Sequence, residues 1–258
     1  MNRGIYGAAS GMMASQQWLD VVSNNLANVN TVGFKRDGIV FHDWMERSLN
    51  SNGGAGERVG TLGAGPTATK MYTAWTVGTL STTDNPLDVA IITDEGLFAV
   101  QLPARPGESE PQVVYTRDGA FQYGEGGMLV TRSQPPLNSQ YPVLDQNLQP
   151  IYLDPTRPAT IDEKGNVGPL IDGNGANAQI GLFRGDFTKL GSNLYEGREV
   201  EPFEAGRVQQ RALEGSNVNT VETMIQMITV SRAFELAQKA ITTQDENNGR
   251  LLEVLRGT

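Results

Sequence analysis

The sequence predicts an α+β protein, in which N- and C-terminal helices pair as a discontinuous coiled-coil domain and a central antiparallel all-β domain lies between them. Two observations lead to this fold class. Apolar residues at both ends recur at alternating spacings of three and four, and the intervening region is rich in Gly, Pro, Asn and Thr with short period-two runs. The first spacing is that of helices that pair along a seam. The β domain must therefore bring its own two ends together if the helices are to meet.

Each terminal helix carries its own apolar seam. The first helix is expected at about residues 3–27, with the seam positions Ile5, Met12, Leu19, Val22 and Leu26. The second is expected at about 218–255, with the seam positions Met227, Val230, Phe234, Ile241, Leu251 and Leu255. Three glycines weaken the first helix, since each costs about 1 kcal/mol relative to Ala. We therefore expect this helix to need a partner.

Further apolar side chains lie off both seams. These are Met13, Trp18, Val21, Ile225, Ile228 and Leu236. Two helices cannot bury all of them in a single two-stranded pair. An assembly interface between subunits is therefore favoured over a closed intramolecular hairpin, which remains the alternative.

The central region divides into a connection and a β domain. Residues 1–35 and 217–258 form the expected helical domain, 36–66 an extended Gly-rich connecting loop, and 67–216 a β-rich outer domain. Strand-like runs lie at 69–75, 87–92, 97–102, 113–116, 120–123 and 128–131, with later candidates at 143–144, 150–153, 159–161 and 179–183. Turn signals separate the runs, as in antiparallel all-β domains.

Composition narrows the possible functions. The 258 residues carry a formal net charge of −9 and no basic stripe, which argues against nucleic-acid binding. No apolar run approaches the ~18–20 residues of a membrane span. The N-terminus has no contiguous apolar stretch, so we expect no cleaved secretory signal. Cysteine is absent and His42 is the single histidine, which leaves a poor inventory for catalysis.

Several local patterns could suggest a site but fit turns better. The glycines of 60–70 do not follow the P-loop order, and Asp172-Gly-Asn-Gly lacks the ligand spacing of a calcium loop. His42 beside Asp43 has no placed nucleophile, which favours a surface or interface histidine. The carboxylate pairs lie in turn-like sequence, at Glu108/Glu110 and Asp162/Glu163. We expect no catalytic residue, cofactor, metal site or small-molecule substrate.

Four segments together carry a family resemblance. They are residues 23–36 (Ser-Asn-Asn-Leu-Ala-Asn-Val-Asn-Thr-Val-Gly-Phe-Lys-Arg), 85–98 (with Asn-Pro-Leu-Asp-Val-Ala-Ile, then Asp-Glu-Gly-Leu-Phe), 115–131 (with Tyr-Thr-Arg-Asp-Gly-Ala-Phe, then Gly-Met-Leu-Val-Thr) and 214–224 (Glu-Gly-Ser-Asn-Val-Asn-Thr-Val-Glu-Thr-Met). In this order they resemble the flagellar rod and hook protein family. The residues that carry the family signature are Asn25, Leu26, Asn28, Gly33 and Phe34. One departure is Asp94-Glu-Gly-Leu-Phe98, where the family usually has Gly-x-Gly-Phe-Phe.

The resemblance implies a structural role. Members are exported unfolded through the flagellar type III apparatus and polymerise helically into a tube that transmits torque from motor to hook. The terminal helices form an inner coiled-coil layer, the β domain an outer layer, and the signature lies at the turn between them. Implied partners are further copies of the chain, other rod proteins, the export apparatus and, as a further candidate, the hook. The implied location is the periplasm-spanning rod of the basal body.

The subtype follows from shorter segments. Residues 1–6 and 85–88 are similar to the proximal rod protein, which is favoured, whereas the Gly-rich stretch 50–65 is similar to the extra loop of the distal rod protein. Two less favoured alternatives are an exported peptidoglycan-active enzyme and a secreted adhesin or tail-like fibre.

Overall fold

The computed structural model describes residues 3–43, 47–50, 58–62, 66–103, 111–132, 140–171 and 178–256. The chain forms two compact units. The helical unit comprises Met1–Ala27, Asp37–Ala74 and Asn219–Thr258, and the β unit comprises Asn28–Arg36 and Trp75–Val218. The helical unit therefore contains a long inserted segment that the sequence pattern did not group with the helices.

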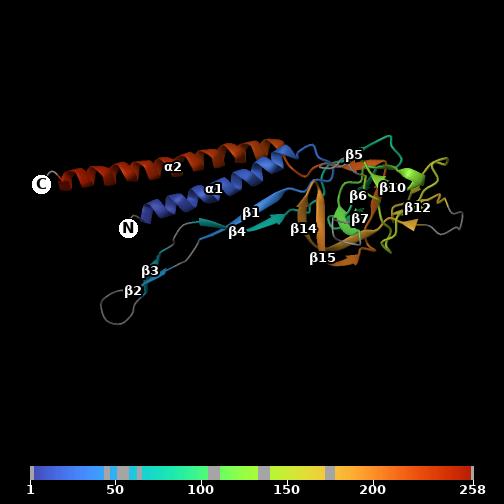
Figure 1. Cartoon of the computed structure of the whole chain (residues 1–258), viewed down its shortest axis with the longest axis horizontal. Coiled ribbons are helices and arrows are strands. Elements are labelled where there is room, and N and C mark those ends of the chain that lie inside the picture. The colour runs from blue at the N-terminus through green and yellow to red at the C-terminus, as the bar shows by residue number, and fades with distance from the viewer. Residues whose placement is uncertain are drawn as a thin grey trace. The chain divides into compact units, whose positions relative to one another are not determined.

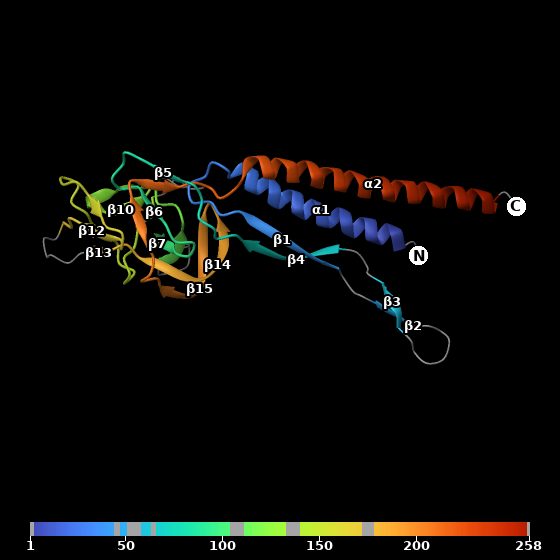
Figure 2. The same cartoon turned by 180° about the vertical axis from the view of Figure 1, so that it is seen from behind.

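Two antiparallel helices dominate the helical unit. Helix α1 spans Arg3–Ala27 and contacts α2, which spans Thr220–Arg256 (Figures 1 and 2). Asn219 caps α2, because its Oδ1 accepts hydrogen bonds from the backbone N–H groups of Val221 and Glu222 at 3.1 and 3.2 Å. A Cβ on Gly4 would overlap with the side chain of Gln244, so glycine permits a close approach of the helices there.

The described strands of the helical unit form two antiparallel pairs. Strand β1 (Asp37–Asp43) pairs antiparallel with β4 (Pro66–Thr73), and β2 (Arg47–Asn50) pairs with β3 (Arg58–Leu62). Both β1 and β4 contact α1, and the ring of Trp18 lies 5.8 Å from that of Phe41 on β1. The stretch 36–66, expected as a connecting loop, thus contains strands. Their regular pairing with a partner strand stabilises an extended chain whose own sequence has no clear alternation.

The β unit consists of short strands whose pairings are all antiparallel. They are β5 (Leu80–Thr82), β6 (Val89–Ile91), β7 (Leu97–Leu102), β8 (Gln112–Thr116), β9 (Phe121–Tyr123), β10 (Leu129–Thr131), β11 (Thr160–Ile161), β12 (Asn166–Gly168), β13 (Ala178–Gln179), β14 (Leu182–Gly191), β15 (Leu194–Pro202), β16 (Val208–Gln210) and β17 (Ala212–Glu214), with the 3₁₀ turn η1 (Glu125–Gly127). Strands β14, β15, β8 and β7 close into a small barrel, while β6 pairs with β16 and β5 with β17. The α+β class and the antiparallel central sheets are confirmed.

Two apolar clusters fill the β unit. In the larger one, Phe98 and Phe121 are fully buried and meet edge to face with their ring centroids 5.1 Å apart. In the smaller one, Tyr115 and Tyr195 pack with Trp75 against the barrel strands. Alternate residues of β7 face different clusters, as the two-residue period of a strand requires.

The two ends of the β unit meet, as the sequence analysis required. The N–H of Gly33 donates to the carbonyl of Glu214 at 2.7 Å, and the N–H of Asn217 donates to the carbonyl of Phe34 at 3.3 Å. Segments that are far apart in the sequence therefore leave the unit side by side.

Candidate assembly surface

Two of the predicted seam positions are buried in the structure, one on each helix. Val22 and Val230 are almost completely buried, with exposed fractions of 1% and 0%. The other described seam side chains are half-buried, namely Ile5, Met12, Leu19, Leu26, Met227, Phe234 and Ile241. The side chains of Leu251 and Leu255 lie outside the described residues. The role of these positions as an assembly interface stays a prediction.

A second apolar face of α2 is uncovered. Its side chains are 48–68% exposed; we call them the outer stripe, which consists of Val221, Met224, Ile225, Ile228 and Leu236. The first four are spaced at three, four and seven residues, so they lie on one side of the helix. Met13 on α1 is also exposed. The other two off-seam residues behave differently: Trp18 packs on Phe41, and Val21 is buried.

Asn25, the first signature residue, is hydrogen-bonded to the residue at which β1 begins. Its Nδ2 donates to the carbonyl of Asp37 at 2.8 Å, and its Oδ1 accepts from the N–H of Asp37 at 2.9 Å. Asn25 is only 6% exposed, so these bonds satisfy a buried amide. The signature asparagine therefore ties the last turn of α1 to the first residue of β1.

Three further signature residues, Asn28, Gly33 and Phe34, lie in the turn that follows α1. Asn28 accepts a hydrogen bond from the hydroxyl of Thr31 at 3.2 Å. Gly33 has φ +67°, and a Cβ there would lie 2.6 Å from the backbone of Arg117, so glycine is required twice over. Phe34 is buried, and Nζ of Lys189 lies 4.3 Å from the centre of its ring.

A buried charge cluster, which the sequence analysis missed, lies beside this turn. The carboxylate of Glu214 accepts from Nζ of Lys35 and from Nε of Arg117, both at 2.6 Å. All three side chains are at most 1% exposed. The only sequence signal was a lysine directly after the buried signature phenylalanine, because its two charged partners lie far along the chain.

The side chains of Lys35 and Arg117 also donate hydrogen bonds to backbone carbonyls. Nζ of Lys35 also donates to the carbonyl of Thr76 at 2.8 Å, and the guanidinium of Arg117 donates to the carbonyl of Gly96 at 2.6 Å. The cluster has two positive groups and one negative group. Burial and, second, the charge of Arg117 lower the pKa of Lys35 from 10.5 to about 8, while Glu214 opposes the shift. Gly96 keeps φ +108°, so the departure at 94–98 retains the glycine turn.

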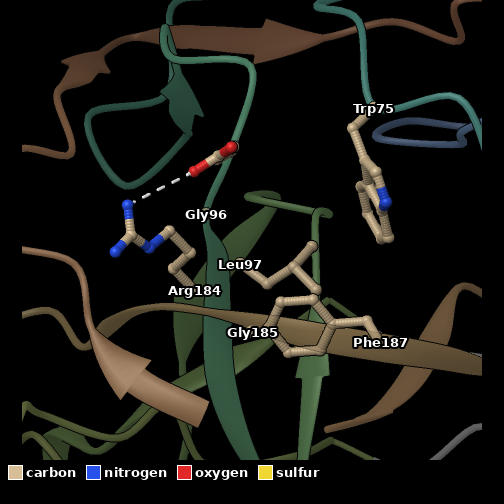
Figure 3. Close-up of a pocket in the computed structure, with 7 residues that line it drawn as sticks. Trp75, Gly96, Leu97, Arg184, Gly185 and Phe187 are labelled. Atoms are coloured by element: carbon tan, nitrogen blue, oxygen red, sulfur yellow. Dashed lines mark ion pairs between the residues drawn. The ribbon is translucent and has the colours of Figure 1, made fainter. Parts of the chain in front are cut away.

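A concave apolar pocket opens on the β unit. Its volume is about 330 Å³, and Trp75, Leu97 and Phe187 form its apolar lining (Figure 3). Arg184 and Glu95 form an ion pair of 3.7 Å at its edge, and both are more than half exposed.

The other candidate positions show ordinary structural roles. Oδ1 of Asp162 accepts the N–H groups of Lys164 and Asn166 in a turn, and Glu163 pairs with Arg207 at 3.3 Å on the surface. His42 is exposed on β1. Glu108, Glu110 and the segment 172–177 lie outside the described residues. Among the described residues, no three acidic, histidine or cysteine side chains are grouped for a metal ion, and no described helix has the length and apolarity of a membrane span.

Comparison with known proteins identifies relatives along nearly the whole chain. Residues 5–35 match the family described as "Flagella basal body rod protein", and residues 209–254 match "Flagellar basal body rod FlgEFG protein C-terminal". The flagellar basal-body rod protein FlgG of Buchnera aphidicola subsp. Schizaphis graminum is 34% identical over 92% of this chain and 94% of its own length. FlgF of Mesorhizobium japonicum is 33% identical over 95% and 96%, and FlgG of Bacillus subtilis is 31% identical over 99% and 100%.

Proposed function

Because the chain belongs to the family of flagellar basal-body rod proteins, we propose that it polymerises helically through its terminal helices into a drive shaft that carries torque from motor to hook. It is a structural subunit of the rod and is located in the flagellar basal body. We further propose that it spans the periplasm as part of the rod and is exported through the flagellar export apparatus.

The outer stripe is the observation that carries the proposal. Large apolar side chains that lie in a row on one helix face and remain half exposed usually mark a surface that another protein covers. The opposite face of α2 already packs against α1. A second copy whose terminal helices pack on the outer stripe would begin a layer of helices. We propose that the helices of this layer pack as coiled coils.

The proposal is tested by placing charge in the outer stripe. Ile225→Lys with Ile228→Lys is expected to prevent polymerisation and swimming while leaving the fold intact, because both side chains are already more than half exposed in the single chain. The measurements are sedimentation of the purified chain under assembly conditions and motility of cells that carry the variant. Seam variants such as Leu19→Asp or Ile241→Asp should also block assembly, by separating α1 from α2.

The matched control is Ile92→Lys, which places the same charge at an exposed isoleucine of the β unit. It should assemble as the unaltered chain does. Normal swimming and polymerisation of the Ile225→Lys, Ile228→Lys variant would remove the outer stripe from the assembly surface.

Within the rod, we propose the proximal position, on the similarity of residues 1–6 and 85–88 to proximal rod protein. The distal position is the alternative, and the relatives carry both FlgG and FlgF names. Cryo-electron microscopy of purified basal bodies with the chain traced in the map separates the two by height along the rod. Density at the hook-side end would refute the proximal assignment.

A further inference from the structure

The chain passes between the two units at four places, and three of them share one hydrogen-bond network inside the β unit. The three lie after Arg36, before Trp75 and after Val218. The N–H of Arg36 donates to Oδ1 of Asn217 at 2.7 Å. Nδ2 of Asn217 in turn donates to the carbonyl of Thr76 at 3.1 Å. Each of these three segments is thus bonded to another within two residues of the point where it leaves the unit.

Glu214 is the centre of this network. Its carboxylate binds Lys35 of the first segment, and its Oε1 also accepts the N–H of Gly78, two residues beyond Thr76 of the second segment, at 2.8 Å. Lys35 itself donates to the carbonyl of Thr76. Glu214 is the last residue of β17, which pairs with β5. One buried carboxylate therefore touches all three segments, directly or through a neighbour.

Arg117 anchors the centre to the body of the β unit. It follows β8 directly in sequence, and its guanidinium donates to the carbonyls of Gly96 and Thr93 as well as to Glu214. Burying charges is costly unless each is paired and hydrogen-bonded, and removal of one member leaves the others uncompensated. Loss of Glu214 would leave two buried cations without a counter-charge, so the whole network depends on this carboxylate.

We propose that Lys35, Arg117 and Glu214 form a lock that closes the β unit on the segment Asn28–Arg36 and keeps the three departing segments together, so that a pull on one is shared by all. The lock is a property of the single chain. Its use in carrying load rests on the proposed function, whereas its existence does not.

The buried amine of Lys35 reports directly on the lock. The full-length chain is pulsed with an amine-acylating reagent at neutral pH, and modification at each lysine is followed by mass spectrometry. The exposed Lys164 serves as the internal reference. In the unaltered chain, Lys35 should react far more slowly than Lys164, because its side chain is 1% exposed. Glu214→Gln should accelerate acylation of Lys35 at least about tenfold, since two buried cations lose their counter-charge.

The matched control is Glu163→Gln, which makes the same chemical change in the exposed pair with Arg207. It should leave the rate at Lys35 within about twofold, as expected for a solvated ion pair. Equal rates at Lys35 in the two variants would overturn the lock.

A second variant separates local opening of the lock from unfolding of the whole β unit. Lys35→Met leaves Arg117 and Glu214 as a neutral pair and removes the hydrogen bonds of Lys35 to Glu214 and to the carbonyl of Thr76. Hydrogen exchange of the amides of Gly33 and Arg36 should then rise at least about tenfold, while the amide of Val100 in the barrel stays unchanged, as in local opening. Unchanged exchange at Gly33 and Arg36 would refute the proposal. Neither readout involves polymerisation, so a failure of the proposed assembly would leave both intact.

Discussion

Alkaline pH should stabilise the β unit through Lys35. The pKa of Lys35 falls from 10.5 to about 8 in the folded chain because burial and the neighbouring Arg117 disfavour its charged form. Between these two values the unfolded chain binds a proton that the folded chain has released. The free energy of unfolding must therefore rise with pH in this window, and the penalty of burying the charge is present in full only below about pH 8.

The size of the effect follows from the two pKa values. Treated as a single titrating site with 10.5 in the unfolded chain and about 8 in the folded chain, Lys35 raises the free energy of unfolding by roughly 1 kcal/mol between pH 7 and pH 9. The charged groups that act on Lys35 are Arg117, Glu214 and Asp94, and Nζ of Lys189 donates to its carbonyl. The opposing attraction of Glu214 and Asp94 is already contained in the lowered pKa.

Urea unfolding followed by tryptophan fluorescence measures this change. The chain has 3 tryptophans, and Trp18→Phe with Trp44→Phe leaves Trp75, which packs on Tyr195 in the β unit with ring centroids 5.2 Å apart. The reference is Lys35→Met in the same background, which cannot titrate at this position. The difference between the two chains isolates Lys35 from every other group, including Tyr115, whose pKa burial raises.

The unaltered chain should gain stability relative to the Lys35→Met reference as pH rises from 7 to 9. Parallel pH profiles for the two chains would show that the pKa of Lys35 is not lowered by folding. A relative loss of stability would mean that its charged pairing with Glu214 outweighs burial.

Two further predictions concern the family signature. Gly33→Ala should destabilise the β unit by about 1–3 kcal/mol in the same fluorescence assay, since φ is +67° and a Cβ would lie 2.6 Å from backbone atoms. The control is Gly126→Ala, where φ is +66° but the space for a Cβ is open. An equal loss of stability in the control would show that the backbone angle alone causes the effect, without the steric overlap. Asn25→Ala should lower the unfolding midpoint of the helical unit, seen by circular dichroism, by removing both hydrogen bonds to Asp37 at a cost of about 1–3 kcal/mol; an unchanged midpoint would show that water replaces them without loss.

The helices and their faces could be predicted because the signal is local. The spacing, with the asparagines that follow, predicted a first helix at about residues 3–27, and α1 spans Arg3–Ala27. Val22 and Val230, two of the predicted seam positions, are buried. The same holds for β7 and β8, whose apolar runs are bounded by turn signals. An apolar pattern that repeats along a helix or strand indicates the buried side even when the partner element is not known.

The elements that were missed depend on partners distant in the sequence. Strands β14 and β15 form a hairpin of which only the beginning was predicted, because most of their side chains are exposed and show no apolar alternation. The charge cluster is the clearest case. Apart from its place directly after Phe34, nothing local distinguishes Lys35 from the exposed Arg36 beside it. Its charged partner Glu214 lies 179 residues later.

In the proposed assembly, each single contact between the helices of two subunits must be weak. Burying an exposed aliphatic side chain contributes about 1.5–3 kcal/mol, and the five side chains of the outer stripe are 48–68% exposed, so covering them all contributes roughly 5–9 kcal/mol. Association costs an estimated 4–15 kcal/mol in lost translation and rotation. One such contact is therefore near balance, whereas a subunit that enters a helical lattice loses this freedom once and gains several contacts. Free chains would then stay apart in dilute solution and join only at the end of a growing rod.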